Sequence, residues 1–575
     1  MVRGSDQRDL QADVTYTISR RRFLQWVGTT GIGVAGLGTL LAACGGESET
    51  ATSAATSAAS SGGNQSQPTT AAATTSSGTT AASPASTGAS SAVGTKSVLK
   101  IGWGEDFLSL DPSQMRETMA TELGYKIYSS LVLVKSGSPG EFVGDLAVKW
   151  DISPDGTEFT FNLQPNAKWH KDYGDVTAQD VNFSFMRHKD EAVASHFAAE
   201  AGPIEDVEVV DPHTAKVVMS EPYPAFFTEF AAYRPGFIVN KKAIEEFGKD
   251  YSSKPVGSGP FVFTSWSPKE KVVLTRFADF YGESGVFETV EYHMISEEAT
   301  REIALEHGDI DICYLFDPST QSKAESDKKL NIAKAPGPRT YYIQLNNEHK
   351  PYDDVRVRQA LWYAIDRKAI TQGVLKGQAD PAYSLLNSYC FGQVTTEFNP
   401  YDPDKAKSLL EEAGFKPGSQ ASMLVEGSDA IASDMAAAIQ AMWKEVGVDV
   451  KLELVEWASH VEKRKAGNFD FGLQPQLRLG SDQYFGELVD SNSIPYPNCS
   501  RFKDDEMDKL IEFARVTADD AKRKQIYEDL QKLTADKVPV IPIIHPSFMV
   551  ASQKNIQGAV VGLITINITE LTVSG

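Results

Sequence analysis

Met435 to Leu454 read MAAAIQAMWKEVGVDVKLEL, a helical pattern that passes directly into a strand pattern. The apolar residues on one face of this helix are Met435, Ile439, Met442, Trp443 and Val446. Gly447 ends the helix, and from Val448 to Leu454 apolar and polar side chains alternate as in a half-buried strand. A helix, a glycine and a strand in this order form half of a βαβ unit, so the pattern predicts an α/β protein with a parallel sheet.

The neighbouring sequence extends this pattern in both directions. Phe159 to Leu163 alternates as a strand, and Val98 to Gly102 opens the body of the chain as another. Helices are predicted after Asp354, where apolar residues recur every three or four positions, and from Pro403 to a stop at Gly414. Residues 98–575 are too many for one hydrophobic core, so we expect at least two lobes.

Four blocks in this order resemble the extracellular solute-binding proteins of family five, the peptide and nickel class. They are Asp145–Thr157, Thr177–Phe185, Pro255–Phe261, and Val355–Leu361 with Ala364–Arg367. The resemblance implies an α/β fold of the type II periplasmic-binding-protein kind in its large, three-subdomain form, whose two lobes close on a ligand. Lobe I would comprise residues 98–340 and 538–575, with an extra subdomain at about 135–255, and lobe II residues 341–537.

Each block also has a structural interpretation that needs no ligand. Asp155-Gly156 is a turn between strands, and Gly257, Gly259 and Pro260 let the backbone turn where the chain re-enters lobe I. The charged side chains on or beside the helix after Asp354 are Arg356, Arg358, Asp366 and Arg367. We expect them to form a solvated network of ion pairs rather than to contact ligand.

The same resemblance points to the ligand site. Arg116, Glu117 and Thr118 correspond to the stretch that runs beside bound peptide in peptide-binding members. Trp457 corresponds to a pocket tryptophan, and Asp482 to the carboxylate that receives a peptide's amino terminus. An arginine that some oligopeptide binders place after the Phe469-Asp470-Phe471 position is replaced by leucine, and Arg478 in a longer loop is its candidate substitute. His545 lies near the second crossover, where peptide binders often have tyrosines.

For three of these residues a purely structural role remains an alternative to ligand binding. Ser481 or Asp482 would cap the helix expected from Gln483 to Val489. Trp457 would be an ordinary core residue, and His545 a hydrogen-bonded or solvent-facing histidine. The departures from the peptide binders leave the ligand undecided among peptides, the first choice, and an oligosaccharide, a metal chelate or another small solute.

Composition and motifs exclude several other functions. A net charge of −22 argues against nucleic-acid binding, because phosphate contacts need a basic surface. Four cysteines and no Cys-x-x-Cys pair argue against a disulfide scaffold or a zinc site, although an oxidising compartment permits one disulfide among Cys313, Cys390 and Cys499. Residues 98–575 contain no Gly-x-Ser-x-Gly, His-Glu-x-x-His or Walker motif, so we expect no enzyme, cofactor or metal. A secreted hydrolase with paired carboxylates is the remaining enzymatic alternative, because such pairs have no local signature.

The N-terminal residues read as an export signal. Arg20 and Arg21 precede a weakly apolar, glycine-rich run, which indicates a twin-arginine signal over residues 1–43. Leu41-Ala42-Ala43-Cys44 has the form of a lipoprotein cleavage site, so Cys44 is expected to carry lipid; a transmembrane anchor is the alternative. Residues 44–97, rich in Ser, Thr and Ala, are predicted to be a flexible tether. Taken together, these features predict a monomeric lipoprotein outside the cytoplasm. It would capture peptides for an ABC importer, which consists of a permease and separate ATPase subunits.

Overall fold

The structure is a computed structural model that describes residues 96–138, 140–418, 420–562 and 565–574. The chain divides into two units, Met1–Ala89 and Ser90–Gly575, and every described residue lies in the second. The predicted signal and tether, with Arg20, Arg21 and Cys44, therefore lie outside the described residues, apart from the last two positions of the tether.

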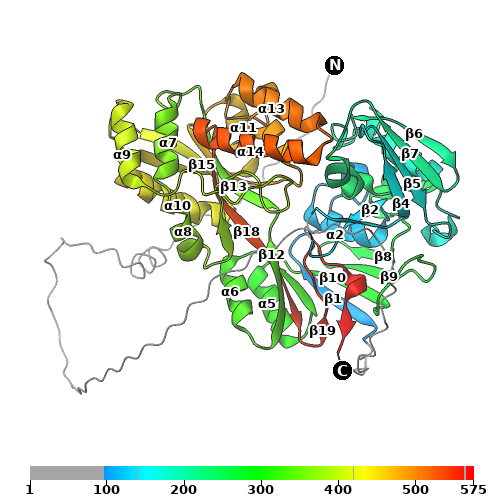
Figure 1. The fold of residues 1–575 in the computed structure, drawn as a ribbon. Coiled ribbons are helices and arrows are strands. Elements are labelled where there is room, and N and C mark those ends of the chain that lie inside the picture. The colour runs from blue at the N-terminus through cyan, green and yellow to red at the C-terminus, as the bar shows by residue number, and fades with distance from the viewer. Residues whose placement is uncertain (1–95, 139, 419, 563–564, 575) are drawn as a thin grey trace, which may run out of the picture. The chain divides into compact units, whose positions relative to one another are not determined.

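A sheet of twelve strands organises the described part of the chain (Figure 1). Its main path runs β16 (Asp449–Val455), β15 (Gln420–Glu426), β17 (Phe471–Leu477), β13 (Arg339–Leu345), β18 (Val540–Gln553), β11 (Ile312–Leu315), β1 (Val98–Trp103), β10 (Thr289–Met294), β9 (Lys271–Arg276) and β8 (Phe261–Ser267). Two further strands, β12 (Leu330–Pro336) and β14 (Ala379–Pro381), pair with β18. The fold is thus mixed α/β, as the sequence predicts.

Strand β18 belongs to both parts of this sheet. Its residues 540–546 pair antiparallel with β13 and β14, and its residues 547–553 pair antiparallel with β11 and β12. Parallel pairing is found on either side, where β15 lies between β16 and β17 and β1 lies between β10 and β11. Figure 1 shows β18 running through the middle of the large sheet.

Three smaller sheets complete the strands of the described residues. They are β4 (Ala147–Ile152), β5 (Glu158–Leu163), β7 (Thr214–Met219) and β6 (Ile204–Asp211) in that order; β2 (Val132–Val134) with β3 (Phe142–Gly144); and β19 (Ile556–Gln557) with β20 (Thr572–Val573). The four-stranded sheet has its own hydrophobic core, which includes Phe161 and Phe226. Gly156, in the turn between β4 and β5, has φ +73°, which explains the glycine in the predicted turn.

The helices follow the strands along the chain. The α-helices are α2 (Thr118–Ile127), α3 (Ala178–Met186), α4 (Lys241–Phe247), α5 (Glu298–His307), α6 (Pro318–Ser326), α7 (Val355–Tyr363), α8 (Arg367–Ala369), α9 (Pro403–Glu412), α10 (Ala430–Glu445), α11 (Trp457–Ala466), α12 (Ser481–Leu488), α13 (Asp505–Val516) and α14 (Asp520–Lys537). The short 3-10 or π turns are η1 (Pro112–Gln114), η2 (His170–Asp172), η3 (Arg187–Lys189), η4 (Phe226–Ala231), η5 (Arg234–Gly236), η6 (Gly248–Ser253), η7 (Ile370–Val374), η8 (Ser491–Ser493) and η9 (Ile568–Glu570).

The helix–glycine–strand pattern at residues 435–454 is confirmed. Helix α10 buries Met435, Ile439 and Trp443, which form the predicted apolar face. Gly447 has φ +90°, a conformation that side chains disfavour, and the chain then enters β16 parallel to β15.

The solvated ion-pair network expected around α7 is wrong for two of its members. Arg358 is buried and donates to the carbonyl groups of Lys537, Val538, Tyr352 and Asp353. Arg367 is also buried, donates to the carbonyl groups of Ala382 and Pro542 at 2.8 Å each, and lies against the ring of Trp362. The two guanidinium groups satisfy backbone oxygens around the start of β18, so their role is structural. Only Arg356 makes an ion pair of the expected kind, with Asp354 at 2.7 Å.

The glycines at 257 and 259 mark a close backbone approach. A Cβ at Gly257 would lie 1.9 Å from the carbonyl oxygen of Ile127, and one at Gly259 would lie 2.8 Å from the Ile127 carbonyl carbon. The segment therefore needs glycine because it crosses the end of α2 in direct contact. The three described cysteines, Cys313, Cys390 and Cys499, are buried and free.

Candidate functional site

Three parallel strands present their carboxyl ends at one edge of the large sheet. Strand β15 pairs in parallel with β16 on one side and with β17 on the other. Trp457 comes two residues after the end of β16, and Arg478 comes directly after β17. Ligands of open α/β sheets bind outside the carboxyl ends of such strands, so this edge is the natural place for the predicted site.

Asp482 lies in the first turn of α12 and is held by an arginine from α13. Arg515 Nε donates to its two carboxylate oxygens at 3.1 and 3.2 Å. The helix-cap interpretation is wrong, because the N-cap residue is Gly480 and the Ser481 hydroxyl donates to the carbonyl of Phe391 instead. Burial raises the pKa of Asp482, and Arg515 opposes this rise only in part. The carboxylate is therefore poised to gain from a further cation.

Arg478 is engaged within the same segment. Its Nε donates to both carboxylate oxygens of Glu487 at 2.9 Å, and Nη2 makes a further contact with that carboxylate. A paired arginine of this kind fixes the loop before α12 and neutralises Glu487. It is available to a ligand carboxylate only by sharing.

Trp457 does not belong to the core, so its interpretation as an ordinary core residue is wrong. The side chain begins α11 and is 43% exposed, and its ring stacks on His460 with centroids 5.6 Å apart. Because β15 lies between β16 and β17, Trp457 is about two strand spacings, roughly 10 Å, from the end of β17. It shares the sheet edge with Arg478 and Asp482, although among the described residues no hydrogen bond or ring contact joins it to either.

His545 is tied to α12 through a hydroxyl. Its Nδ1 lies 3.1 Å from Thr340 Oγ1, which in turn lies 3.0 Å from the hydroxyl of Tyr484 on α12. Burial lowers the pKa of His545 to about 4, so the ring is neutral at pH 7. The hydrogen-bonded alternative of the sequence analysis fits this geometry, and it places His545 two hydrogen bonds from the helix that carries Asp482.

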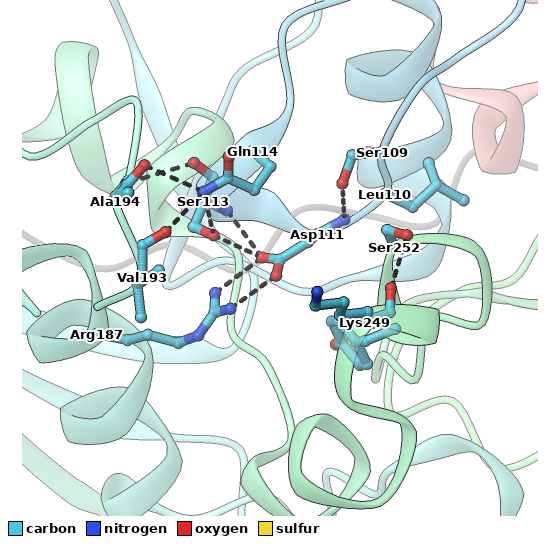
Figure 2. A network of polar contacts seen from close by, with 12 residues as sticks. Ser109, Leu110, Asp111, Ser113, Gln114, Arg187, Val193, Ala194, Lys249 and Ser252 are labelled. Atoms are coloured by element: carbon cyan, nitrogen blue, oxygen red, sulfur yellow. Dashed lines mark hydrogen bonds and ion pairs between the residues drawn. The ribbon is translucent and has the colours of Figure 1, made fainter. Parts of the chain in front are cut away.

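The Arg116–Thr118 segment enters α2 from an anchored loop. Figure 2 shows Asp111, just before η1, facing Arg187 of η3; the two pairs of atoms are 2.8 and 2.7 Å apart. Gln114 donates to the carbonyl groups of Val193 and Ala194 at 3.0 and 3.2 Å. These bonds fix the loop against the segment that follows α3.

The three predicted residues themselves lie beyond this anchor. Arg116 Nη2 lies 3.0 Å from His196 Nδ1 and is exposed, while Glu117 is the N-cap residue of α2 and Thr118 its first residue. In the described part of the chain, no hydrogen bond, ion pair or ring contact joins them to Asp482, Arg478 or Trp457. The structure thus groups Asp482, Arg478 and His545 around α12 and places the Arg116 segment beside His196 instead.

Sequence reasoning missed a set of contacts between segments that are far apart in the chain. Tyr233 shares a small hydrophobic cluster with Tyr389 and Leu479, and the Tyr389 hydroxyl donates to the carbonyl of Gly562 at 3.2 Å. Glu229 lies against Gly480. A signal for Glu229 existed, since it is the only charge between Phe226 and Tyr233, a run of aromatic and small residues. No local sequence signal pointed to Arg515, because it is 33 positions from Asp482.

Two cavities elsewhere in the described chain are lined by none of the predicted site residues. A cavity of about 130 Å³ is lined by residues including Tyr125, Asp145 and Asn567, and a groove of about 500 Å³ follows the edge of β12. The described residues hold no cluster of three or more His, Cys, Asp or Glu side chains placed to bind a metal ion. Within the same residues, none of the helices combines the length and the hydropathy that crossing a bilayer requires.

The described residues form an α/β fold in which three parallel strands end at one edge of the large sheet. The sequence matches the family described as "Bacterial extracellular solute-binding proteins, family 5 Middle" over residues 141–484, more than half of the chain. The chain belongs to this family and is a solute-binding protein, as the four sequence blocks imply.

Individual relatives agree with this assignment. The dipeptide-binding protein of Escherichia coli is 28% identical over 463 residues, covering 76% of this chain and 86% of its own. Heme-binding protein A of Haemophilus influenzae is 28% identical over 448 residues, covering 73% and 82%. The crystal structure of the ABC transporter substrate-binding protein CtaP from Listeria monocytogenes superposes with a TM-score of 0.76 at 25% identity, covering 83% of this chain and 99% of that one. The predicted fold of the type II periplasmic-binding-protein kind is thereby confirmed.

Proposed function

We propose that this protein is the receptor of an ABC importer and that it captures peptides between its two lobes outside the cytoplasm. The observation that carries the peptide assignment is the partly buried carboxylate of Asp482, whose side chain is 17% exposed, at the carboxyl edge of the sheet. A carboxylate in such a place binds an ammonium strongly, because charge-assisted hydrogen bonds gain strength where water is excluded. The relative from Escherichia coli is named for dipeptides, which supports the same ligand class.

Each predicted site residue has a role in this proposal. Asp482 receives the amino terminus, sharing Arg515, and Trp457 lies beside the first side chain. Arg478 and His545 fix the loop and strand that frame the site, and the segment Arg116–Thr118 closes on the peptide backbone from lobe I. No residue is asked to make or break a covalent bond.

Calorimetry on a matched pair of variants tests the role of Asp482. Asp482→Asn is expected to weaken binding of a free-amine dipeptide by a few kcal/mol while an N-acetylated dipeptide, which lacks the amine charge, binds equally to both forms. Asp504→Asn is the control, because Asp504 pairs with Lys537 at 3.0 Å and its side chain is 15% exposed, against 17% for Asp482. An unchanged free-amine affinity in Asp482→Asn would remove this residue from the site.

The ligand class itself is tested by native mass spectrometry of protein purified without refolding. A co-purifying peptide supports the proposal, whereas co-purifying haem, oligosaccharide or metal chelate would identify that solute as the ligand instead. Haem is included because one relative is named for it. Incubation with peptides, followed by product analysis, should return them intact, and turnover would favour the hydrolase alternative. Small-angle scattering should show a smaller radius of gyration with ligand if the lobes close.

The location of the protein has its own test. Cys44→Ala is expected to release the body from membranes without changing ligand affinity, because the lipid is the proposed anchor. Replacing Arg20 and Arg21 by lysine is expected to block export. Persistent membrane association of Cys44→Ala would refute the lipid anchor, and normal export of the double variant would refute the twin-arginine signal.

A further inference from the structure

Glu229 is a buried carboxyl group with an unfilled hydrogen-bonding position. It lies in η4 among Phe226, Phe227 and Phe230, and the whole residue is 4% exposed. The Tyr223 hydroxyl donates to Oε2 at 3.3 Å, but Oε1 has no hydrogen-bond partner among the described residues. Burying a carboxylate without a partner is costly, so native proteins rarely leave one in this state without a function.

The unfilled oxygen points out of lobe I toward the candidate site. A Cβ at Gly480 would lie 1.5 Å from Glu229 Oε1, so the carboxyl group rests directly on the Gly480 backbone. Gly480 is the N-cap residue of α12, and Asp482 follows two positions later. Glu229 and Asp482 therefore approach the same space from opposite lobes, and only a glycine at position 480 permits it.

Charge in this space is unbalanced. The titratable and charged groups that act on Glu229 are Tyr223 and Glu200 of lobe I, and Cys390, Asp482, Glu487, Arg515 and Tyr527 of lobe II. Of the cations nearby, Arg515 is paired with Asp482 and Arg478 with Glu487. Among the described residues, no lysine, arginine or histidine forms an ion pair with Glu229. Burial first, and then the charge of Asp482, raise the pKa of Glu229 well above its ordinary value.

We propose that Glu229 is a ligand-binding residue, which takes the cationic group of the ligand, an ammonium or a guanidinium, on the face opposite Asp482. This inference rests on the proposed receptor function and specifies the ligand's charge. Without ligand, burial and the charge of Asp482 favour the protonated form of this carboxyl group, because both raise its pKa. When Glu229 and Gly480 move apart and the ligand's cation enters between them, the carboxyl proton leaves to solvent and the carboxylate pairs with the cation, so that charge is conserved.

A contact that only holds the lobes together would behave differently. If the contact between Glu229 and Gly480 only held the lobes together, it would exclude the ligand cation from Gly480, and no proton would be released when ligand binds. Uptake of a cation in exchange for a proton, in contrast, makes affinity rise with pH, because deprotonation then removes a competitor.

The experiment is calorimetry with dialanine at pH 6 to 8 in two buffers that differ in ionisation enthalpy, which counts the protons released on binding. Wild type is expected to release up to one proton, and log affinity to rise with pH with a slope of up to one. Glu229→Gln, which resembles the protonated acid in shape, is expected to release almost none, to lose the slope, and to bind dialanine at least tenfold more weakly at pH 8. Asp145→Asn is the control: burial raises the pKa of this lobe I carboxyl to about 6, but it bonds to Tyr281 away from Gly480, so its removal leaves the proton count unchanged.

The outcomes separate the two proposals. Dialanine binding without proton release, and with the same affinity in Glu229→Gln, overturns the assignment of Glu229 and leaves the receptor function intact. If neither dialanine nor longer peptides bind, the proposed peptide function is wrong. The same calorimetry is then carried out with 1,4-diaminobutane, a dication. If this dication does not bind either, the inference about Glu229 is also wrong. Thermal melting of Glu229→Gln checks that the variant folds, and Glu229→Asp, which keeps the charge but withdraws it by one methylene, should retain the pH slope with weaker binding.

Discussion

The ion pair between Asp111 and Arg187 gives the sharpest stability prediction. The Asp111 side chain is 13% exposed and the Arg187 side chain 12%, and two hydrogen bonds join them at 2.8 and 2.7 Å. Replacing Asp111 by asparagine leaves Arg187 buried without a counter-charge, a change that costs about 3–5 kcal/mol in fully buried pairs. Because some water reaches this pair, we expect the lower end, about 3 kcal/mol, as a loss of unfolding free energy.

Urea denaturation of four proteins measures this loss. Asp111→Asn, Arg187→Met, the double variant and wild type form a cycle whose interaction energy is expected to be about 2–3 kcal/mol, since the double variant buries no unpaired charge. Asp250→Asn is the control. Asp250 forms an ion pair with Lys254 at a similar distance, 2.8 Å, but the side chains of Asp250 and Lys254 are 65% and 56% exposed. Exposed pairs contribute little, so less than about 0.5 kcal/mol is expected there. A loss below about 1 kcal/mol in Asp111→Asn would refute the reasoning.

The same pair has a defined pH dependence. Burial alone would raise the pKa of Asp111, but the hydrogen bonds and charge of Arg187 outweigh it and hold the pKa below its usual value of 3.8. A carboxyl whose folded pKa is lowered contributes stability above its unfolded pKa and loses it as the pH falls through the folded pKa. The stability difference between wild type and Asp111→Asn should therefore persist down to pH 4 and shrink only below it.

Three further variants test the packing described above. Gly257→Ala should lower the melting temperature, at a cost of at least about 1–3 kcal/mol, because its Cβ meets the Ile127 carbonyl oxygen at 1.9 Å; an unchanged melting temperature would contradict the close approach. Burial lowers the pKa of His170 to about 4, so wild type should lose up to ~3 kcal/mol more than His170→Gln as the pH falls from 6.5 to 4, and parallel curves of stability against pH would speak against a buried neutral ring. Arg367→Met should lose about 2–4 kcal/mol in urea, since two buried carbonyl groups lose their donor, and a neutral effect would show that water replaces the guanidinium.

Local patterns predicted those elements whose partners are near in sequence. The α10 helix, Gly447 and β16 were predictable because helical period, left-handed glycine and strand alternation are each properties of a few consecutive residues. The family blocks added the fold class, because their order along the chain reflects the topology. The lobe boundaries stay predictions, and β18 shows why a boundary is hard to place, since a single strand serves both parts of the sheet.

Charged residues were predicted less well, because their partners are distant in sequence. Arg358 looks like a surface residue of a helix, yet it bonds to carbonyl groups 179 and 180 positions away. Asp482 looks like a helix cap until Arg515 is folded against it. The contact of Glu229 with Gly480 joins two residues far apart in the chain, and nothing in either local sequence names the other.

The position of β18 also has a consequence for how the protein is made. This central strand consists of residues 540–553, later in the sequence than every other strand of the large sheet. Domains generally fold in the order in which the ribosome releases them, yet here neither part of the sheet can be completed until almost the whole chain has been synthesised. Nascent chains must therefore wait with β11 and β13 unpaired on one side, exposed to aggregation and in need of chaperones. A frameshift or stop codon before residue 540 would remove the middle of the large sheet rather than trim a tail.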